Sequence, residues 1–134
     1  MHKPQRQVLE FHRALWTPWN ATPTDPPSEV KDLRIRLMRE ELNEVEQASD
    51  EHDITAVAKE LADLLYTVYG TACAWGIDME PIFDAVHRSN MTKERAAGPG
   101  HKILKGQNYR APEIEPLILE QTSGAKPRGV RQGA

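Results

Sequence analysis

Residues 33–48 read LRIRLMREELNEVEQA, and the spacing of their apolar side chains predicts a helix with one buried face. The inward stripe of that helix consists of Val30, Leu33, Leu37 and Ala48. Glu41 and Glu44 fall in the centre of the same stripe, where a core helix normally carries leucine. An unpaired carboxylate in such a place is costly. We therefore expect positive charge to meet both glutamates.

A second carboxylate pair, Glu60 and Asp63, follows on another expected helix after a spacer of 15 residues. Each pair has i, i+3 spacing and so projects from one helix face. Facing pairs would place four carboxylates around one site, and an all-oxygen site favours Mg²⁺ or Mn²⁺. Two alternatives stay open, namely solvated surface charge and buried salt bridges to Arg34 or Arg36. The apolar stripe of the helix that carries Glu60 and Asp63 consists of Ile54, Val57, Leu61, Leu64, Leu65, Val68, Ala72 and Trp75.

The whole chain is expected to be all-α, a bundle of four main helices, because no stretch alternates apolar and polar residues as a strand does. We predict helices over residues 4–16, 28–50, 53–75 and 79–95, and a short one over 113–121. Ser28 and Asp78 are the expected N-caps, and Gly76 the expected helix end. Residues 101–111 should be irregular or briefly extended. Residues 1–121 form the predicted domain, and 122–134 a disordered basic tail.

Composition excludes several classes of protein. The chain has 134 residues, enough for one domain, and a net charge of −3, which disfavours a duplex nucleic-acid binder. Its single cysteine, Cys73, allows no intrachain disulfide. The apolar segment Leu61–Ile77 is shorter than a membrane span and carries Asp63. No signal peptide is recognisable at the N-terminus, so we expect a cytoplasmic protein without a membrane segment.

Charge is distributed unevenly along the chain. Residues 40–63 carry a net charge of −8, whereas residues 87–110 carry +5. An acidic block holds cations and a basic block holds phosphates, so a magnesium-bound polyphosphate would satisfy both. Asn90 continues the apolar stripe of the fourth helix, which predicts a buried amide. That amide would contact a nucleotide or a magnesium-bound water, or else a neighbouring helix end.

Three motifs together resemble a known family. They are Arg39-Glu40-Glu41-Leu42-Asn43-Glu44, Glu60-Leu61-Ala62-Asp63-Leu64-Leu65-Tyr66 and His87-Arg88-Ser89-Asn90-Met91-Thr92-Lys93. In this order they are similar to the all-α nucleoside triphosphate pyrophosphohydrolases, which include MazG-like proteins, phosphoribosyl-ATP pyrophosphohydrolases and dimeric dUTPases. Phe11-His12 and Lys102-Ile103-Leu104-Lys105-Gly106 also fit. The resemblance extends over residues 8–119.

The resemblance implies Mg²⁺-dependent cleavage of an NTP or dNTP between its α- and β-phosphates, with nucleotide-pool housecleaning as the leading role. It implies Mg²⁺, or Mn²⁺ as a substitute, bound by Glu41, Glu44, Glu60 and Asp63. Glu40 is the candidate catalytic base for the attacking water. The implied substrate-binding residues are Asn90, Lys93, Arg88, Lys102, Lys105 and Tyr109. The family further implies a homodimer that completes the bundle, or a tetramer.

Three other functions remain to be tested. Phosphoribosyl-ATP hydrolysis in histidine synthesis would use the same carboxylates with a different base and ribose pocket. A non-catalytic helical dimer would bind a partner through its apolar faces. A di-iron protein would need two Glu-x-x-His motifs, whereas the chain offers only Asp84-x-x-His87.

Overall fold

The computed structural model describes residues 1–96, 100 and 102–124, and the described chain is mostly helical. The helices are α1 (Lys3–Ala14), α2 (Ser28–Asp50), α3 (Ile54–Trp75), α4 (Met79–Asn90) and α5 (Glu115–Thr122). A small antiparallel hairpin joins β1 (Glu94–Arg95) to β2 (Ile103–Leu104). The predicted all-α class is confirmed. The predicted tail falls almost entirely on residues 125–134, which lie outside the described residues.

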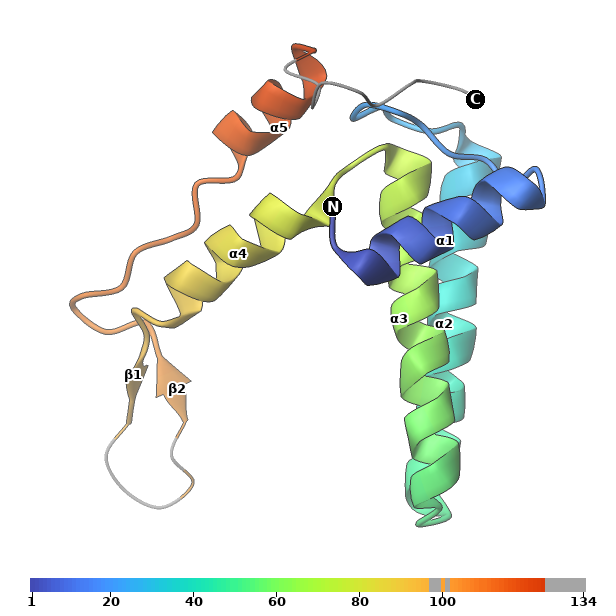
Figure 1. Cartoon of the computed structure of the whole chain (residues 1–134). Coiled ribbons are helices and arrows are strands. Elements are labelled where there is room, and N and C mark those ends of the chain that lie inside the picture. The colour runs from blue at the N-terminus through green and yellow to red at the C-terminus, as the bar shows by residue number, and fades with distance from the viewer. Residues whose placement is uncertain (97–99, 101, 125–134) are drawn as a thin grey trace.

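The core is built around α3. Helix α2 runs antiparallel beside α3, and α1 crosses both near the end of α3 that leads into α4 (Figure 1). Helix α4 and the hairpin extend away from this group (Figure 1), whereas Gln121 of α5 hydrogen-bonds to the backbone of Asp78 at the start of α4. The buried apolar side chains are small and few. All but Ala48, near the end of α2, lie on α1, on the last turns of α3 or on α4: Val8, Ala72, Cys73, Ala74, Ile82 and Ala85.

The ends of α3 and α4 follow from local chemistry. The Asp53 side chain accepts a hydrogen bond from the Ala56 backbone N–H at 3.0 Å, which caps α3. Gly76 ends α3 with φ of 70°, and a Cβ there would lie 2.1 Å from the Thr22 carbonyl oxygen. Asp78 caps α4 by accepting from the Glu80 N–H at 3.1 Å, as predicted.

Two predicted details of the helix ends are wrong. Ser28 does not cap α2, because it is the first helical residue and Pro27 occupies the N-cap without a side-chain hydrogen bond. Helix α4 stops at Asn90 rather than at residue 95, because the chain turns there into β1. The Thr92 hydroxyl donates to the Ser89 carbonyl at 2.7 Å and stabilises this turn.

The predicted inward stripe of α3 is only partly buried. Ile54, Leu61, Leu65 and Val68 are between 40% and 85% exposed, and Phe83, Val86 and Met91 on or just after α4 are also exposed. The reason is that α3 turns its carboxylate pair toward α2, which leaves the leucines of the other face uncovered within one chain. Among the described residues, no helix is long and apolar enough to cross a membrane.

Candidate functional site

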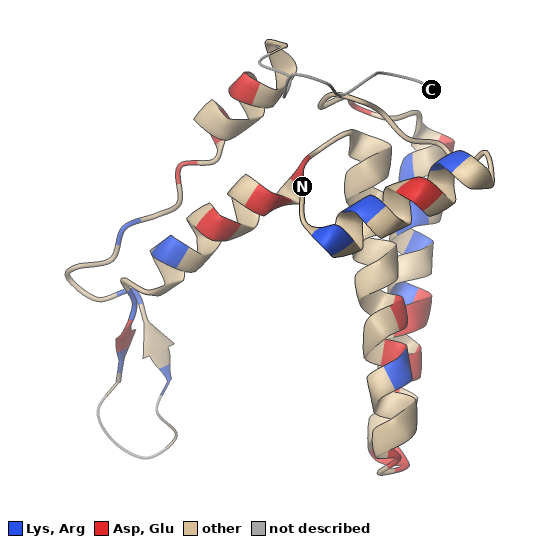
Figure 2. Ribbon diagram, viewed as in Figure 1, with Lys and Arg blue, Asp and Glu red and all other residues tan. Residues whose placement is uncertain are grey.

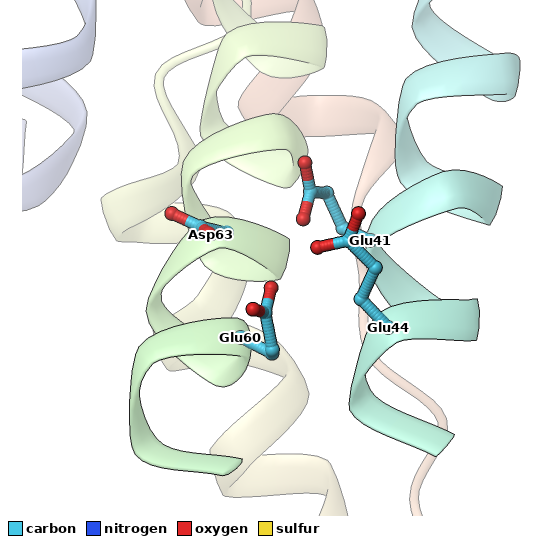
Figure 3. Close-up of side chains that lie close together, drawn as sticks. All are labelled: Glu41, Glu44, Glu60 and Asp63. Carbon is cyan, nitrogen blue, oxygen red and sulfur yellow. The ribbon is translucent and has the colours of Figure 1, made fainter. Parts of the chain in front are cut away.

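Four carboxylates converge between α2 and α3, halfway along the two helices. Glu41 and Glu44 project from α2, and Glu60 and Asp63 project from α3 (Figure 3). One oxygen from each of the four lies within 4.8 Å of the others. We call this group the acidic cluster. Its geometry is the one that two facing i, i+3 pairs predict, and Glu41 and Glu44 do lie on the face of α2 that contacts α3.

The electrostatics of the acidic cluster are unfavourable without a cation. Burial raises the pKa of Glu41, and the neighbouring Asp63 and Glu60 carboxylates raise it further. The pKa of Glu60 is also raised, first because its carboxyl group shares a hydrogen bond with Glu44. Each raised pKa means that the protein environment disfavours the ionised form of the group. The cluster therefore holds more negative charge than its surroundings neutralise.

Two buried oxygen atoms of the acidic cluster have no hydrogen-bond partner among the described residues. They are Oε2 of Glu41 and Oε2 of Glu60, one on each helix. Buried polar atoms are almost always paired, so two orphaned acceptors in one cluster indicate a missing positive partner. Carboxylate oxygens are the ligands that Mg²⁺ and Mn²⁺ prefer. The residues present therefore fit a divalent cation held between the two helices.

Lys59 supplies the one ammonium group found at the acidic cluster in the described part of the chain. Its Nζ lies 2.7 Å from Oδ2 of Asp63 and 3.5 Å from Oε1 of Glu60. In Figure 3 the Asp63 carboxylate lies to one side of the other three, although one of its oxygens is still within 4.8 Å of theirs, and this position agrees with the pairing to Lys59. Asp63 chiefly accounts for the raised pKa of Lys59. Lys59 is largely exposed and leaves Glu41 and Glu44 unpaired.

Arg34 and Arg36 do not neutralise the acidic cluster. In the described residues neither forms an ion pair, and the buried Arg34 instead donates to Thr67 and Thr71 of α3. The alternative of buried salt bridges to the two glutamates is therefore wrong for this structure. The solvated-surface alternative fits no better, because two of the oxygens are buried.

Glu40, the candidate base, is exposed on α2 beside the acidic cluster. Its charge contributes to the raised pKa of Glu41, which places it within electrostatic reach of the cluster. It is not one of the four converging ligands. Its role in activating water remains a prediction.

The predicted substrate-binding residues lie on a different part of the molecule. We call the described residues from α4 to residue 114 the arm. It carries all six predicted residues: Arg88, Asn90, Lys93, Lys102, Lys105 and Tyr109. Figures 1 and 2 show the arm, with several basic residues, standing apart from the α2–α3 pair. The structure therefore brings the four carboxylates together but does not bring the six arm residues to them within one chain.

Internal contacts organise the arm. Lys105 Nζ lies 5.1 Å from the Tyr109 ring centroid, and the Arg110 N–H donates to the Thr92 hydroxyl at 2.9 Å. The expectation that Asn90 is buried is wrong, because Asn90 is exposed. Its neighbour Ser89 is buried instead, and the Ser89 hydroxyl donates to the Arg110 carbonyl at 2.7 Å. The segment after the hairpin folds back on that face of α4 and turns Asn90 toward solvent.

The fold and the acidic cluster together define a class of all-α proteins with a four-carboxylate site between two antiparallel helices. A comparison with protein-family models matches residues 8–90, more than half of the chain, to phosphoribosyl-ATP pyrophosphohydrolase. The chain belongs to this family and is a nucleotide pyrophosphohydrolase. A comparison with curated proteins finds no match. The matched residues include the acidic cluster and end at Asn90, and the cluster contains no histidine, unlike a di-iron site.

Proposed function

We propose that the protein is a Mg²⁺-dependent pyrophosphohydrolase that cleaves an NTP or dNTP to the monophosphate and pyrophosphate. The observation that carries the proposal is the acidic cluster, with its ligand atoms within 4.8 Å and its two orphaned buried oxygens. Glu41, Glu44, Glu60 and Asp63 would hold Mg²⁺, with Mn²⁺ as a substitute. The bound ion would neutralise phosphate charge and make the α-phosphorus more electrophilic.

The chain's own residues divide the remaining work. Glu40, exposed next to the acidic cluster, is suited to accept a proton from the attacking water. Lys93, Lys102 and Lys105 would bind the phosphate oxygens, since ammonium groups recognise phosphate as point charges. Asn90 and Tyr109 have polar groups and a ring face suited to the base or sugar. Arg88, which is exposed near the end of α4, would add charge on the phosphates.

We further propose that the working unit is a homodimer, or a tetramer built from it. The exposed leucines of α3 and the exposed apolar side chains of α4 form large uncovered surfaces, such as Leu65 at 56% and Phe83 at 61%. Soluble monomers rarely leave such surfaces open. A second copy would cover them, and its basic arm complements the acidic cluster in charge. In this arrangement one protomer supplies the carboxylates and its partner the arm residues.

A second substrate, phosphoribosyl-ATP, is favoured by the family that residues 8–90 match. This molecule also carries a nucleoside triphosphate, so the acidic cluster and the arm would treat its phosphates in the same way. The two substrates differ only in what surrounds the base. Housecleaning in the cytoplasm and a step of histidine synthesis are thus distinguished by the substrate ranking, not by the metal centre.

The deciding experiment measures pyrophosphate and monophosphate release from a panel of NTPs, dNTPs, modified nucleotides and phosphoribosyl-ATP, with and without Mg²⁺ or Mn²⁺. Glu44→Gln should reduce the rate by about 10²- to 10³-fold, as expected when one strong electrostatic contact is lost. Glu46→Gln is the matched control, because Glu46 is exposed on the same helix outside the acidic cluster. Silence toward every substrate with both metals would refute the proposal.

A further inference from the structure

Arg34 is buried without any ion-pair partner among residues 1–96, 100 and 102–124. Its residue exposure is 6%, and burial lowers its pKa. Removing a guanidinium from water costs several kcal/mol, and an apolar residue of similar volume is often at least as stabilising. Stability alone therefore does not explain an arginine at this position.

The guanidinium of Arg34 links α2 to α3. Its Nη2 donates to the Thr67 carbonyl at 3.2 Å, and its Nε lies 3.5 Å from the Thr71 hydroxyl oxygen, which itself donates to Thr67 at 2.8 Å. Thr67 follows Asp63 by one helical turn, and Arg34 precedes Glu41 by two turns on the same face. The link therefore lies between one and two helical turns from the acidic cluster along the α2–α3 contact.

Helix α1 also packs against the guanidinium of Arg34, through His12. A Cβ on Gly70 would lie 2.1 Å from Nη2 of Arg34 and 3.0 Å from Nε2 of His12 on α1. His12 donates from Nδ1 to the Pro18 carbonyl at 3.0 Å, which makes Nε2 of the neutral ring an acceptor near the guanidinium. Gly70 thus leaves only enough room for the guanidinium, and three helices are fixed around it.

The acidic cluster is sensitive to the spacing that this link sets. Two oxygens bound to one Mg²⁺ at about 2.1 Å can be no more than about 4.2 Å apart. The four ligand atoms lie within 4.8 Å of one another, slightly beyond that limit, so any further separation of α2 and α3 would prevent the pairs from sharing an ion. Shifts of about 1 Å in a supporting group are enough to impair such sites.

We infer that Arg34 is a positioning residue for the metal centre, seated by Gly70, that sets the distance and register between α2 and α3 beside the acidic cluster. This inference rests on the proposed function, since it assigns Arg34 a role in cation binding. It predicts that changes at Arg34 or Gly70 weaken cation affinity without an equal loss of stability.

The test measures Mn²⁺ affinity by electron paramagnetic resonance and stability by urea unfolding of the metal-free protein. Arg34→Met and Gly70→Ala should each raise the Kd for Mn²⁺ by about tenfold, in the range found when groups supporting metal ligands are removed. Arg34→Met should unfold at the same or a higher urea concentration. Arg34→Lys, which keeps the charge and one donor, should regain part of the affinity. Arg36→Met, an exposed arginine on the same helix, should bind as the wild type does.

Activity gives an independent readout of positioning. The Mg²⁺ concentration for half-maximal rate should rise in Arg34→Met, while the rate at saturating Mg²⁺ recovers to near the wild-type value. A variant that loses stability but keeps the wild-type Kd for Mn²⁺ would show that Arg34 is only a packing residue and would overturn the inference. If Arg34→Met does not fold, Arg34→Lys and Gly70→Ala decide by the same criterion. A wild type that binds no Mn²⁺ refutes the proposed metal centre itself, and this role with it.

Discussion

The acidic cluster and the arm carry opposite charge and differ in how completely one chain forms them. The cluster is assembled by two helices that are joined by a short turn and pack along their length. The arm has its own internal contacts, but most of its basic residues are exposed, and it stands apart from the cluster (Figure 2). A cation site between neighbouring helices is therefore formed locally, whereas a complete nucleotide site requires the arm to meet a cluster from elsewhere.

The strongest test of this comparison is complementation between two damaged chains. Glu44→Gln and Lys93→Ala should each lose about 10²-fold or more in rate, because each removes charge from the reacting phosphates. When the two variants are mixed, unfolded and refolded together, about a quarter of the wild-type activity should return. Random pairing makes half of the dimers heterodimers. Each heterodimer has one intact site, formed by the acidic cluster of the Lys93→Ala chain and the arm of the Glu44→Gln chain, and one site that carries both changes. The assay is pyrophosphate release from the best substrate of the panel.

Two outcomes would break the comparison. If both single variants are inactive and the mixture stays inactive too, the arm serves the acidic cluster of its own chain. A Lys93→Ala variant with wild-type activity would show that Lys93 of the arm is not part of the site. Light scattering of Leu65→Glu separates the question of assembly from that of the site. Leu65→Glu should give a monomer, and a variant that stays dimeric would show that this face of α3 is not the interface.

The second prediction concerns the cluster alone. Mg²⁺ should stabilise the wild type by about 2.7 kcal/mol at a free concentration one hundred times its Kd, by mass action on the folded state. Metal-free Glu41→Gln should be as stable as the metal-free wild type or more so, because one of four mutually repelling carboxylates is gone. Thermal melts with EDTA or Mg²⁺ measure both effects. A wild-type melting temperature insensitive to Mg²⁺ would contradict the assignment.

Much of the fold and of the acidic cluster was predictable because the relevant forces are local. Helix periodicity, Asp53, Gly76 and Asp78 define where the helices begin and end, and carboxylates in an apolar stripe indicate that two helices bring them together. The helix pattern predicts that Leu61 and Leu65 are buried, but both are exposed. A sequence pattern shows which face of a helix is apolar, but not whether the same chain covers that face. The prediction that Asn90 is buried is wrong for a similar reason, because the contact that buries its neighbour Ser89 is with Arg110, 21 residues further along the chain.

Arg34 shows the limit of charge-based prediction. In the sequence, Arg34 is a candidate ion-pair partner for Glu41 and Glu44 on the same helix. In the structure, its guanidinium instead contacts Thr67 and Thr71 of α3. The space at Gly70 that admits the guanidinium depends on three helices meeting. No signal within a single helix reports such a meeting, so the buried arginine was found only in three dimensions.

A smaller effect is expected on acidification at the α1–α3 contact. His12 is 2% exposed, and burial is the main cause of its lowered pKa. The unfolded chain takes up a proton near pH 6.5 whereas the folded chain resists it, so this contribution to stability is complete above that pH and is lost as the pH falls. The free energy of unfolding should drop by at most about 1.4 kcal/mol per pH unit below 6.5.

Urea unfolding between pH 5 and 8 measures this effect as the difference between the wild type and His12→Asn, in which an amide can still donate to Pro18. The difference cancels the carboxylates of the acidic cluster, whose raised pKa values act in the opposite direction. His52→Asn is the matched control, because His52 is exposed and its φ of 56° suits asparagine. Equal slopes in the wild type and His12→Asn would show that His12 does not titrate between the two states.

The smallest expected effect on cation binding concerns Lys59, whose ammonium group already pairs with carboxylates of the acidic cluster. Its ammonium group pairs with Asp63 and Glu60, two of the four ligands, and competes with a cation for both carboxylates. Lys59→Met should therefore raise Mn²⁺ affinity severalfold in resonance titrations, and the gain should shrink at high salt, which screens an exposed pair. Lys31→Met, which removes a pair with Asp25 near the start of α2, should leave the affinity unchanged. A weaker Mn²⁺ affinity in Lys59→Met would mean that the lysine orients Asp63 for the cation instead of competing with it, and that α3 contributes basic as well as acidic groups to the working site.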